Sequence, residues 1–211
     1  MDIDESRRGE NPFEEPARKL RGMDPEEVAA RTGGRFRAGP DGTGEVVVPV
    51  LSWTVKVAFP AVDVTADPRV DSFTFKLLTL LYLSNSDGLA PTGEWVAYRE
   101  LAGGRFYEPV VRRSVEDPLA RRFGLDAGTF LAACAAAGGR QEPLGDASCS
   151  FDLFPLVRAA FLLWRADEEF EARVQVLFDS GATHHLNAFD LRMGAAEIAS
   201  LLLKWRAGES S

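Results

Sequence analysis

Residues 149–178 read CSFDLFPLVRAAFLLWRADEEFEARVQVLF, and this stretch decides the fold class. It contains three apolar, strand-like runs, at residues 149–154, 159–164 and 174–178. The acidic residues 167–169 lie between the second and third runs, so we expect a hairpin that turns there. Strands that follow one another without an intervening helix pair antiparallel, which predicts a mainly antiparallel sheet.

The residues that follow this sheet predict a C-terminal amphipathic helix. Asn187 is a good N-cap residue, and Asp190 at the third helical position forms an approximate capping box with it. Apolar residues then recur at helical spacing, which gives the helix one continuous apolar face. These residues are Leu191, Ala195, Ile198, Leu202 and Trp205. Gly194 lies inside this helix although glycine lowers helix stability.

The N-terminal half predicts a short helix and then a β-meander. Asp24 can cap a helix that starts at Pro25 and ends at Gly33, which can adopt the left-handed conformation. Strands are expected at 45–51, 53–59 and 61–65, and Pro49 predicts that the first of them is an edge strand or breaks near its end.

The middle of the chain predicts helices that cover the sheet. Asp71 or Ser72 can cap a buried helix that runs to about Leu83. A strand at 92–100, a loop with aromatic anchors at 101–109, and helices at 110–123 and 127–137 are then expected. The predicted fold class is therefore α+β: a mainly antiparallel sheet covered by helices.

The chain is acidic and long enough for one self-sufficient domain. Its 211 residues include 24 basic and 32 acidic ones, a formal net charge of −8, which disfavours nucleic-acid binding. We expect a disordered tail at 1–22, a single domain at 23–206 and a frayed C-terminus at 207–211. The N-terminus has no apolar signal region, and no apolar run is long enough to span a membrane, so we expect a cytoplasmic protein without a membrane partner.

The two cysteines give no sign of a metal or redox site. Cys134 and Cys149 lack CxxC spacing, and no iron–sulfur motif is present in this chain. We interpret both as small, reduced core residues.

Three Gly-Gly-Arg sequences, beginning at Gly33, Gly103 and Gly138, are the first candidates for a ligand site. Paired glycines before a guanidinium can cradle an anion, but the first and third copies are expected to end helices. The second copy lies among aromatic and basic residues and is the better candidate for a ligand-binding loop. The candidate ligand-binding residues are Arg99, Gly103, Gly104, Arg105, Tyr107 and Trp164.

A carboxylate–histidine metal site is the alternative. The only histidine pair, at 184–185, lies close in sequence to Asp179, and the run at 167–169 lies in the adjoining hairpin. The simpler interpretation is that these residues form solvated turns and a helix start. The candidate metal ligands are Asp167, Glu169, Asp179, His184 and His185.

Several segments in a distinctive order resemble a family with a domain of unknown function from anaerobic bacteria and archaea. The resemblance covers roughly residues 23–205 and rests on Leu80–Leu83, Pro91–Leu101, Gly103–Tyr107, Phe123–Gly124, Gly138–Gly139, Gly145–Ala147, Leu163–Phe170 and Leu177–Asp179. Some members of that family are fused to an N-terminal iron–sulfur module like that of corrinoid iron–sulfur proteins. The resemblance implies a link to cofactor, redox or one-carbon metabolism. Residues 1–22 contain no cysteine, so any cluster would have to be on a partner protein.

The sequence therefore favours an accessory or binding protein over an enzyme. Its expected partner is a cofactor-bearing or iron–sulfur-bearing protein, engaged through the aromatic and arginine residues around Arg99 and Arg105. The alternative is a metal- or cofactor-dependent enzyme that uses the acidic–histidine cluster. The sequence indicates neither a particular cofactor nor an oligomeric state.

Overall fold

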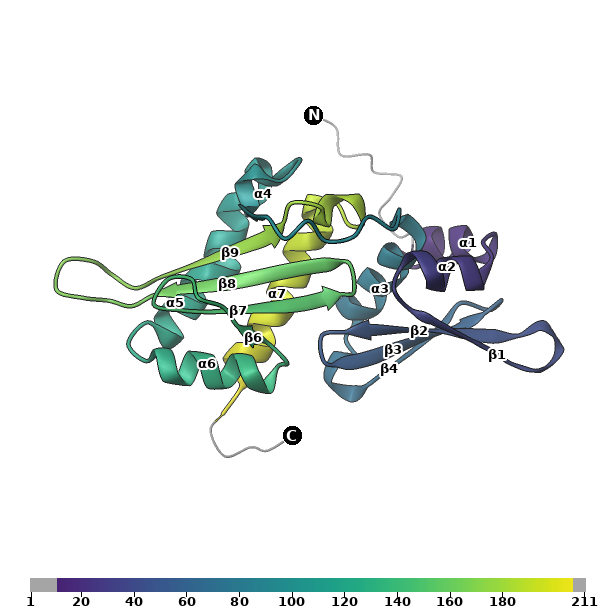
Figure 1. The fold of residues 1–211 in the computed structure, drawn as a ribbon, viewed down its shortest axis with the longest axis horizontal. Coiled ribbons are helices and arrows are strands. Elements are labelled where there is room, and N and C mark those ends of the chain that lie inside the picture. The colour runs from purple at the N-terminus through teal and green to yellow at the C-terminus, as the bar shows by residue number, and fades with distance from the viewer. Residues whose placement is uncertain (1–10, 207–211) are drawn as a thin grey trace.

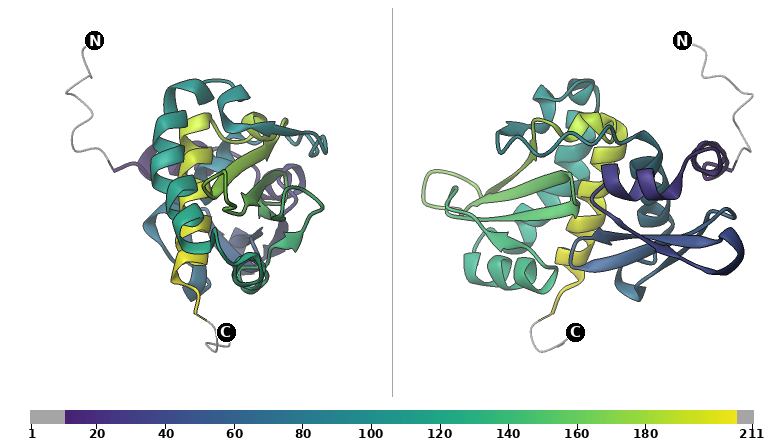
Figure 2. Two further views of the ribbon diagram at one scale, coloured as in Figure 1. Left: turned by 90° about the vertical axis from the view of Figure 1, so that its left-hand side faces the viewer. Right: turned by 45° about the vertical axis from the view of Figure 1, so that its right-hand side comes forward.

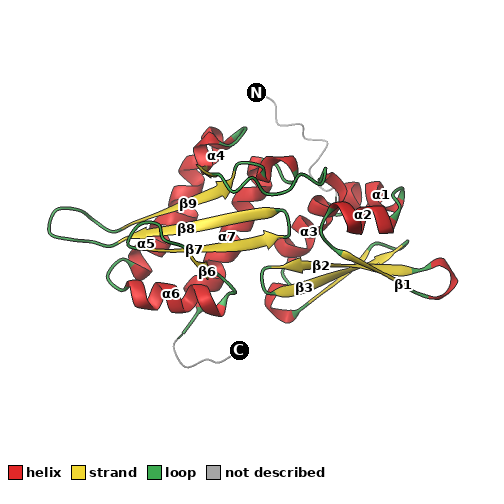
Figure 3. Cartoon of the chain, in the orientation of Figure 1, coloured by secondary structure: helices red, strands yellow, loops and turns green. Residues whose placement is uncertain are grey.

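The computed structural model describes residues 11–206 and has the α+β architecture that the sequence predicts (Figure 1). Two antiparallel sheets, one of four strands and one of five, lie side by side with helices packed against them (Figure 3). The first ten residues of the expected tail and the expected frayed end at 207–211 lie outside the described residues.

The first sheet is an antiparallel meander in the order β1-β2-β3-β4. Its strands are β1 (Arg35–Ala38), β2 (Gly44–Val50), β3 (Trp53–Phe59) and β4 (Asp63–Ala66). The sequence does not predict β1, because Arg-Phe-Arg-Ala shows no extended apolar alternation. Pro49 lies in β2 and pairs with Thr54 of β3. Strand β1 pairs with β2 only as far as Val47, so at Pro49 the other side of β2 is an open edge where no partner needs the missing N–H.

Helices α2 (Pro25–Arg31) and α3 (Phe73–Asn85) pack against this sheet, and α1 (Glu14–Arg21) packs against α3. The predicted caps are confirmed, since Asp24 accepts from the backbone N–H of Glu26 at 2.9 Å and Ser72 from that of Phe75 at 3.0 Å. Helix α1 corrects the expected tail at 1–22. The sequence around it has no long apolar pattern, but α1 packs against α3 and thereby buries Pro16, Ala17 and Leu20.

The second sheet has the order β5-β9-β8-β7-β6, with every neighbouring pair antiparallel. Its strands are β5 (Trp95–Ala97), β6 (Arg140–Gln141), β7 (Ala147–Phe154), β8 (Val157–Trp164) and β9 (Arg173–Asp179). The predicted hairpin is confirmed: β8 pairs with β9 from Ala159↔Phe178 to Trp164↔Arg173, and the acidic run lies in the connecting turn.

Helices cover one face of the second sheet (Figure 2). They are α4 (Gly104–Val111), a π-helical segment η5 (Arg112–Glu116), α5 (Asp117–Phe123), α6 (Ala127–Ala136) and α7 (Ala188–Lys204). Short 3-10 turns complete the fold: η2 (Pro40–Gly42), η3 (Pro68–Val70), η4 (Tyr98–Glu100) and η6 (Ala182–His184).

The prediction of a loop at 101–109 is wrong, because α4 begins at Gly104. Paired glycines and Pro109 suggest a loop, yet the glycines start the helix and Pro109 lies inside it. The strand expected at 92–100 is correspondingly short, since the chain leaves β5 after Ala97 and enters η4. The helices expected at 127–137 and from Asn187 are confirmed, with Asn187 accepting from the N–H of Asp190 at 3.0 Å.

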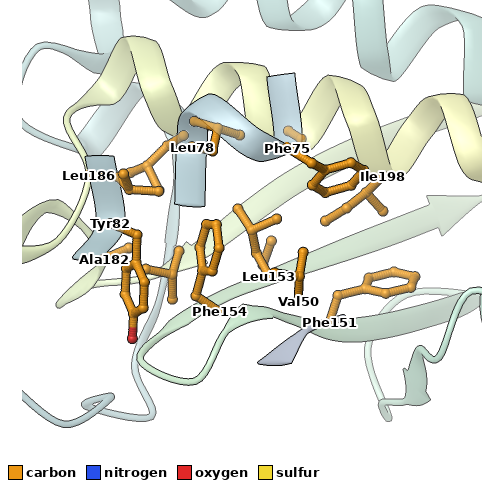
Figure 4. Close-up of a cluster of buried hydrophobic side chains, with 14 of the residues drawn as sticks. Val50, Phe75, Leu78, Tyr82, Phe151, Leu153, Phe154, Ala182, Leu186 and Ile198 are labelled. Atoms are coloured by element: carbon orange, nitrogen blue, oxygen red, sulfur yellow. The ribbon is translucent and has the colours of Figure 1, made fainter. Parts of the chain in front are cut away.

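The hydrophobic core is continuous between the two sheets (Figure 4). Tyr82 of α3 lies at the junction, where its ring stacks on Phe154 of β7 with the centroids 4.4 Å apart. Its hydroxyl donates to the carbonyl oxygen of Thr32 at 2.7 Å and accepts from the N–H of Leu156 at 3.3 Å. One side chain thus connects α2, α3 and the β7–β8 turn.

The two cysteines lie in this core. Both Cys134 of α6 and Cys149 of β7 are buried, and burial raises the pKa of the Cys134 thiol. Within residues 11–206, no helix has both the length and the apolar character that crossing a bilayer requires.

Candidate functional site

Asp179, at the end of β9, holds the segment that precedes β5. Its carboxylate accepts four hydrogen bonds: from the N–H and hydroxyl of Thr92, at 2.9 and 3.0 Å, from the N–H of Gly93 at 2.7 Å, and from the N–H of Gly181 at 3.0 Å. Burial alone would raise the pKa of Asp179, but these hydrogen bonds outweigh it and hold the pKa below its usual range. The carboxylate is thus saturated by its own chain, which is the chemistry of a structural clamp.

His185 holds the same segment a few residues earlier. Its Nε2 lies 3.0 Å from the carbonyl oxygen of Leu89 and its Nδ1 lies 2.7 Å from the hydroxyl of Ser86. A carbonyl can only accept, so Nε2 carries the proton and Nδ1 accepts from Ser86. Burial lowers the pKa of His185, which keeps the ring neutral. The neighbouring His184 is half-exposed, with its Nδ1 2.7 Å from a carboxylate oxygen of Asp87.

The acidic run at 167–169 lies at the opposite end of β9 from Asp179. Asp167 accepts from the N–H groups of Glu169 and Phe170, at 2.8 and 2.7 Å, and these bonds lower its pKa. Glu169 itself is exposed. The five candidate metal ligands therefore fall into two groups separated by the length of a strand. In the described part of the chain, no three His, Cys, Asp or Glu side chains gather so that they could hold a metal ion.

The three Gly-Gly-Arg sequences serve helix ends. Gly33 and Gly138 follow α2 and α6 with φ values of +67° and +82°, as expected of helix terminators. Gly103 and Gly104 instead start α4, with Gly103 in the left-handed region at φ +79°. A Cβ on Gly104 would lie 1.9 Å from the carbonyl oxygen of Tyr98, so close backbone packing accounts for this glycine.

An exposed aromatic cluster lies where α4 meets the start of α7. Phe106 is 74% exposed and packs edge-on against Tyr107, with the centroids 4.9 Å apart. Tyr107 in turn contacts Phe189 at 5.5 Å, and the guanidinium of Arg192 lies 4.6 Å from the Phe189 ring centroid. We call Phe106, Tyr107, Phe189 and Arg192 the aromatic–arginine surface.

The candidates drawn from the sequence include Tyr107 of this surface but neither Phe189 nor Arg192. Phe189 lies outside the apolar stripe of α7, and an aromatic residue on the outer face of an amphipathic helix is the signal that could have revealed it. Arg105 is exposed beside Phe106, and Arg99 lies 4.0 Å from Glu108, an α4 residue. Trp164 lies elsewhere, at the far end of β8, where the guanidinium of Arg173 stacks over its ring at 5.2 Å.

The residues beneath this surface are buried and polar. Tyr98 donates its hydroxyl hydrogen to the carbonyl oxygen of Ala188 at 2.5 Å, which ties η4 to the start of α7. Asp190 is 4% exposed, burial raises its pKa to about 6, and its Oδ2 has no hydrogen-bond partner among the described residues. The predicted capping box is therefore formed only by Asn187, because the Asp190 carboxylate does not return to the helix start.

A charged cleft of about 440 Å³ lies between the consecutive helical segments α4, η5 and α5 on one side and the start of β9 on the other. Its lining includes Arg99, Arg112 and Arg173 together with Glu108 and Glu116. Burial raises the pKa of Glu116, although the N–H of Val176, 2.9 Å from its Oε1, opposes this change. Of the candidate ligand-binding residues, only Arg99 lines this cleft.

Comparison with known proteins gives one match. A family model described as a domain of unknown function (DUF3786) matches residues 24–199. Neither the curated proteins nor the solved structures contain a match to this chain.

Proposed function

Because the chain belongs to this family with a domain of unknown function, we propose its role from its own surface: an accessory or binding protein that engages a partner protein. The observation that carries the proposal is the aromatic–arginine surface. Phe106 and Phe189, which are 74% and 41% exposed, lie on one side of the molecule beside Arg192. Exposed apolar clusters of this kind mark interaction sites, and aromatic residues and arginine dominate the binding energy of protein interfaces.

The surface is also held firmly enough to serve as an interface. It is built on α4 and the start of α7, which the packing of Tyr107 on Phe189 holds together. The Tyr98–Ala188 hydrogen bond also ties η4, against which α4 starts, to α7. Aromatic side chains on rigid elements lose little conformational entropy on binding. Arg105, exposed beside Phe106, adds positive charge at the cluster in an otherwise acidic chain, which favours a partner with acidic residues around an apolar contact.

The proposed partner is a cytoplasmic protein that carries an iron–sulfur cluster or a corrinoid cofactor. This part of the proposal is supported by the resemblance to a family in which some members are fused to an iron–sulfur module. A fused module in one protein and a separate partner in another can serve the same association. The acidic–histidine residues do not favour the alternative enzyme, because these proposed ligands lie at opposite ends of β9 and Asp179 is saturated by hydrogen bonds.

The test begins with a photo-crosslinking amino acid placed at position 106 of the full chain, expressed in the native host. The captured partner is identified by mass spectrometry, purified under anoxic conditions and assayed for iron and cobalt. We expect the double substitution Phe106→Ser and Phe189→Ser to weaken its binding by about tenfold or more in calorimetry.

The matched control is Phe170→Ser, because Phe170 is 69% exposed but lies on the distant β8–β9 turn. This control should bind like the wild type. Equal affinity of the double variant and the wild type would refute the proposed interface, and a partner without iron or cobalt would refute the proposed partner chemistry.

A further inference from the structure

The two cysteines of the chain meet between α6 and the second sheet. Cys134 lies on α6 and Cys149 on β7, 15 positions apart in the sequence. They are 0% and 2% exposed, and both belong to the hydrophobic core. Their spacing in the sequence does not predict that they meet, so the fold alone makes a dithiol of them.

The turn after α6 brings the two residues together. Gly139 donates its N–H to the carbonyl oxygen of Cys134 at 2.8 Å. The chain then enters β6, where Gln141 pairs with Cys149. A Cβ on Gly139 would lie 2.7 Å from the ring of Phe151, which is two residues after Cys149 in β7 and therefore on the same face of the sheet. The last turn of α6 thus packs on the face that presents Cys149.

The two thiols act on each other as donor and acceptor. Burial is the largest influence on Cys134 and raises the pKa of its thiol, and the interaction with Cys149 raises this pKa further. The same interaction is the largest influence on Cys149 and lowers the pKa of its thiol, although burial opposes this. Cys134 is therefore the proton donor of the pair, and Cys149 is the sulfur that becomes a thiolate first.

The elements that cover this pair are short and lie at the edge of the sheet. Strand β6 has two residues, both exposed, and is the last strand of its sheet. Helix α6 ends beside it, and Ala135 and Ala136 in its last turn are exposed. Elements with few buried contacts open at a lower free energy than the core strands of a domain. A small reagent can therefore reach the thiols through local opening while the rest of the sheet stays folded.

We propose that Cys134 and Cys149 form a redox-sensitive dithiol, which a low-molecular-weight disulfide such as oxidised glutathione converts into an intramolecular disulfide. The Cys149 thiolate attacks one sulfur of the oxidant, whose S–S bond breaks, and one glutathione leaves as a thiolate. The Cys134 thiol then loses its proton and attacks the Cys149 sulfur of this mixed disulfide, which releases the second glutathione. The protein loses two electrons and two protons, and the oxidant becomes two molecules of glutathione.

The new bond would fix the end of α6 where the two sheets meet. A Cβ on Gly138 would collide with the side chain of Ser52, so the turn after α6 packs against the turn between β2 and β3. Leu51 in that same turn donates its N–H to the carbonyl oxygen of Asp152 of β7 at 3.1 Å. A disulfide between α6 and β7 also closes a loop in the unfolded chain, which favours the folded state. Oxidation should therefore stabilise the protein, and this effect does not depend on the aromatic–arginine surface.

Mass spectrometry of the intact protein is the first test. The full chain is purified reduced, incubated with oxidised glutathione under native conditions, quenched with acid, and alkylated with N-ethylmaleimide in denaturant. We expect the main product to be lighter by two hydrogen atoms, to carry no N-ethylmaleimide, and to yield a peptide that links Cys134 to Cys149. Stable glutathione adducts on the wild type would overturn the proposal, as would a disulfide that forms only when urea has unfolded the chain.

Single variants test the order of the two steps. Cys134→Ala lacks the second thiol, so it should accumulate a mixed disulfide between Cys149 and glutathione. Cys149→Ala should react about tenfold more slowly, because the remaining thiol is the one whose pKa is raised. Circular dichroism checks that both variants are folded. Equal rates for the two variants would refute Cys149 as the attacking sulfur.

Urea unfolding measures the consequence of the bond. The oxidised wild type should have a higher urea midpoint than the reduced wild type. Cys149→Ala, treated with oxidised glutathione and then with acid-quenched dialysis in the same way, is the matched control and should show no such rise. An oxidised wild type with an unchanged or lower midpoint would show that the bond does not fix α6 to β7 in its native position.

Discussion

His185 is a histidine that the fold uses as a neutral hydrogen-bonding group. It is 2% exposed, and both of its ring nitrogens have partners in the segment that leads to β5. The charged groups around it act in opposite directions: Asp87 and Asp179 raise its pKa, His184 lowers it, and burial, the largest influence, lowers it further. Protonation would place a charge in a site that offers Nδ1 only a hydroxyl.

We therefore predict that the contribution of His185 to stability falls as the pH is lowered from about 7 to 5. The unfolded chain keeps a histidine pKa near 6.5, while the native value is lower, so within this window the unfolded state binds more protons at this residue. This contribution rises with pH, by at most about 1.4 kcal/mol per pH unit for one proton. Asp190, with its pKa raised to about 6, acts in the opposite direction in the same window, so the contribution of His185 is the difference between the wild type and a variant without this ring. Urea unfolding of the wild type and of His185→Gln between pH 5 and 7.5 measures this slope.

The variant should lack this contribution, because its amide can donate to Leu89 without titrating. His184→Gln, which removes the exposed neighbouring imidazole, should keep the slope that His185 causes. Identical slopes for His185→Gln and the wild type would show that this ring does not titrate between the two states.

Among the elements, those with local signals were predictable and those that depend on distant contacts were not. The caps at Asp24, Ser72 and Asn187 and the alternating strands can be recognised within a few residues of sequence, and they are present as predicted. Helix α1 and strand β1 gain their stability from packing and pairing with residues far along the chain. The sequence likewise suggests Asp179 and His185 as functional, but it cannot show that residues 86–93 supply their partners.

Helix α4 is the element whose misprediction is most informative. Gly-Gly before Arg105 and a proline inside the segment both suggest a loop, but Gly104 is required because α4 starts against the η4 backbone. A Cβ at position 104 would lie 1.9 Å from the carbonyl oxygen of Tyr98 and 3.0 Å from its carbonyl carbon. Backbone atoms cannot rotate away as the end of a side chain can.

Gly104→Ala should therefore destabilise the protein by about 3 kcal/mol, as overpacking of a rigid site does. Gly103→Ala is the control, because its Cβ would approach only Ala188, at 3.8 Å. It should lower the free energy of unfolding by only about 1 kcal/mol, which is the cost of a non-glycine residue in the left-handed conformation. Urea midpoints followed by circular dichroism give both values. A Gly104→Ala midpoint at or above that of Gly103→Ala would show that α4 can shift away from η4 at little cost.

At the scale of the whole molecule, two sheets share one core. The turn after β2 is tied to β7 by the bond from the N–H of Leu51 to the carbonyl oxygen of Asp152, at 3.1 Å. Tyr82 joins α3 to both α2 and the second sheet, and burial raises the pKa of its hydroxyl. Neither sheet can separate from the other without exposing these contacts, which argues for one cooperative unit rather than two.

The tryptophans allow the two sheets to be followed separately. Trp53 lies in β3 of the first sheet and Trp164 in β8 of the second. One variant keeps only Trp53 and a second keeps only Trp164, with the other three tryptophans changed to Phe in each, so that each variant reports on one sheet. In each variant, we expect the unfolding midpoint measured by tryptophan fluorescence to equal the midpoint measured by circular dichroism. Adding Tyr82→Phe, which leaves a buried carbonyl and a half-buried N–H without a partner, should lower both stabilities by the same amount, about 1–3 kcal/mol. Because Tyr82 touches both halves, a loss seen by Trp53 alone, or a first sheet that melts before the second, would mean that the sheets unfold as separate units.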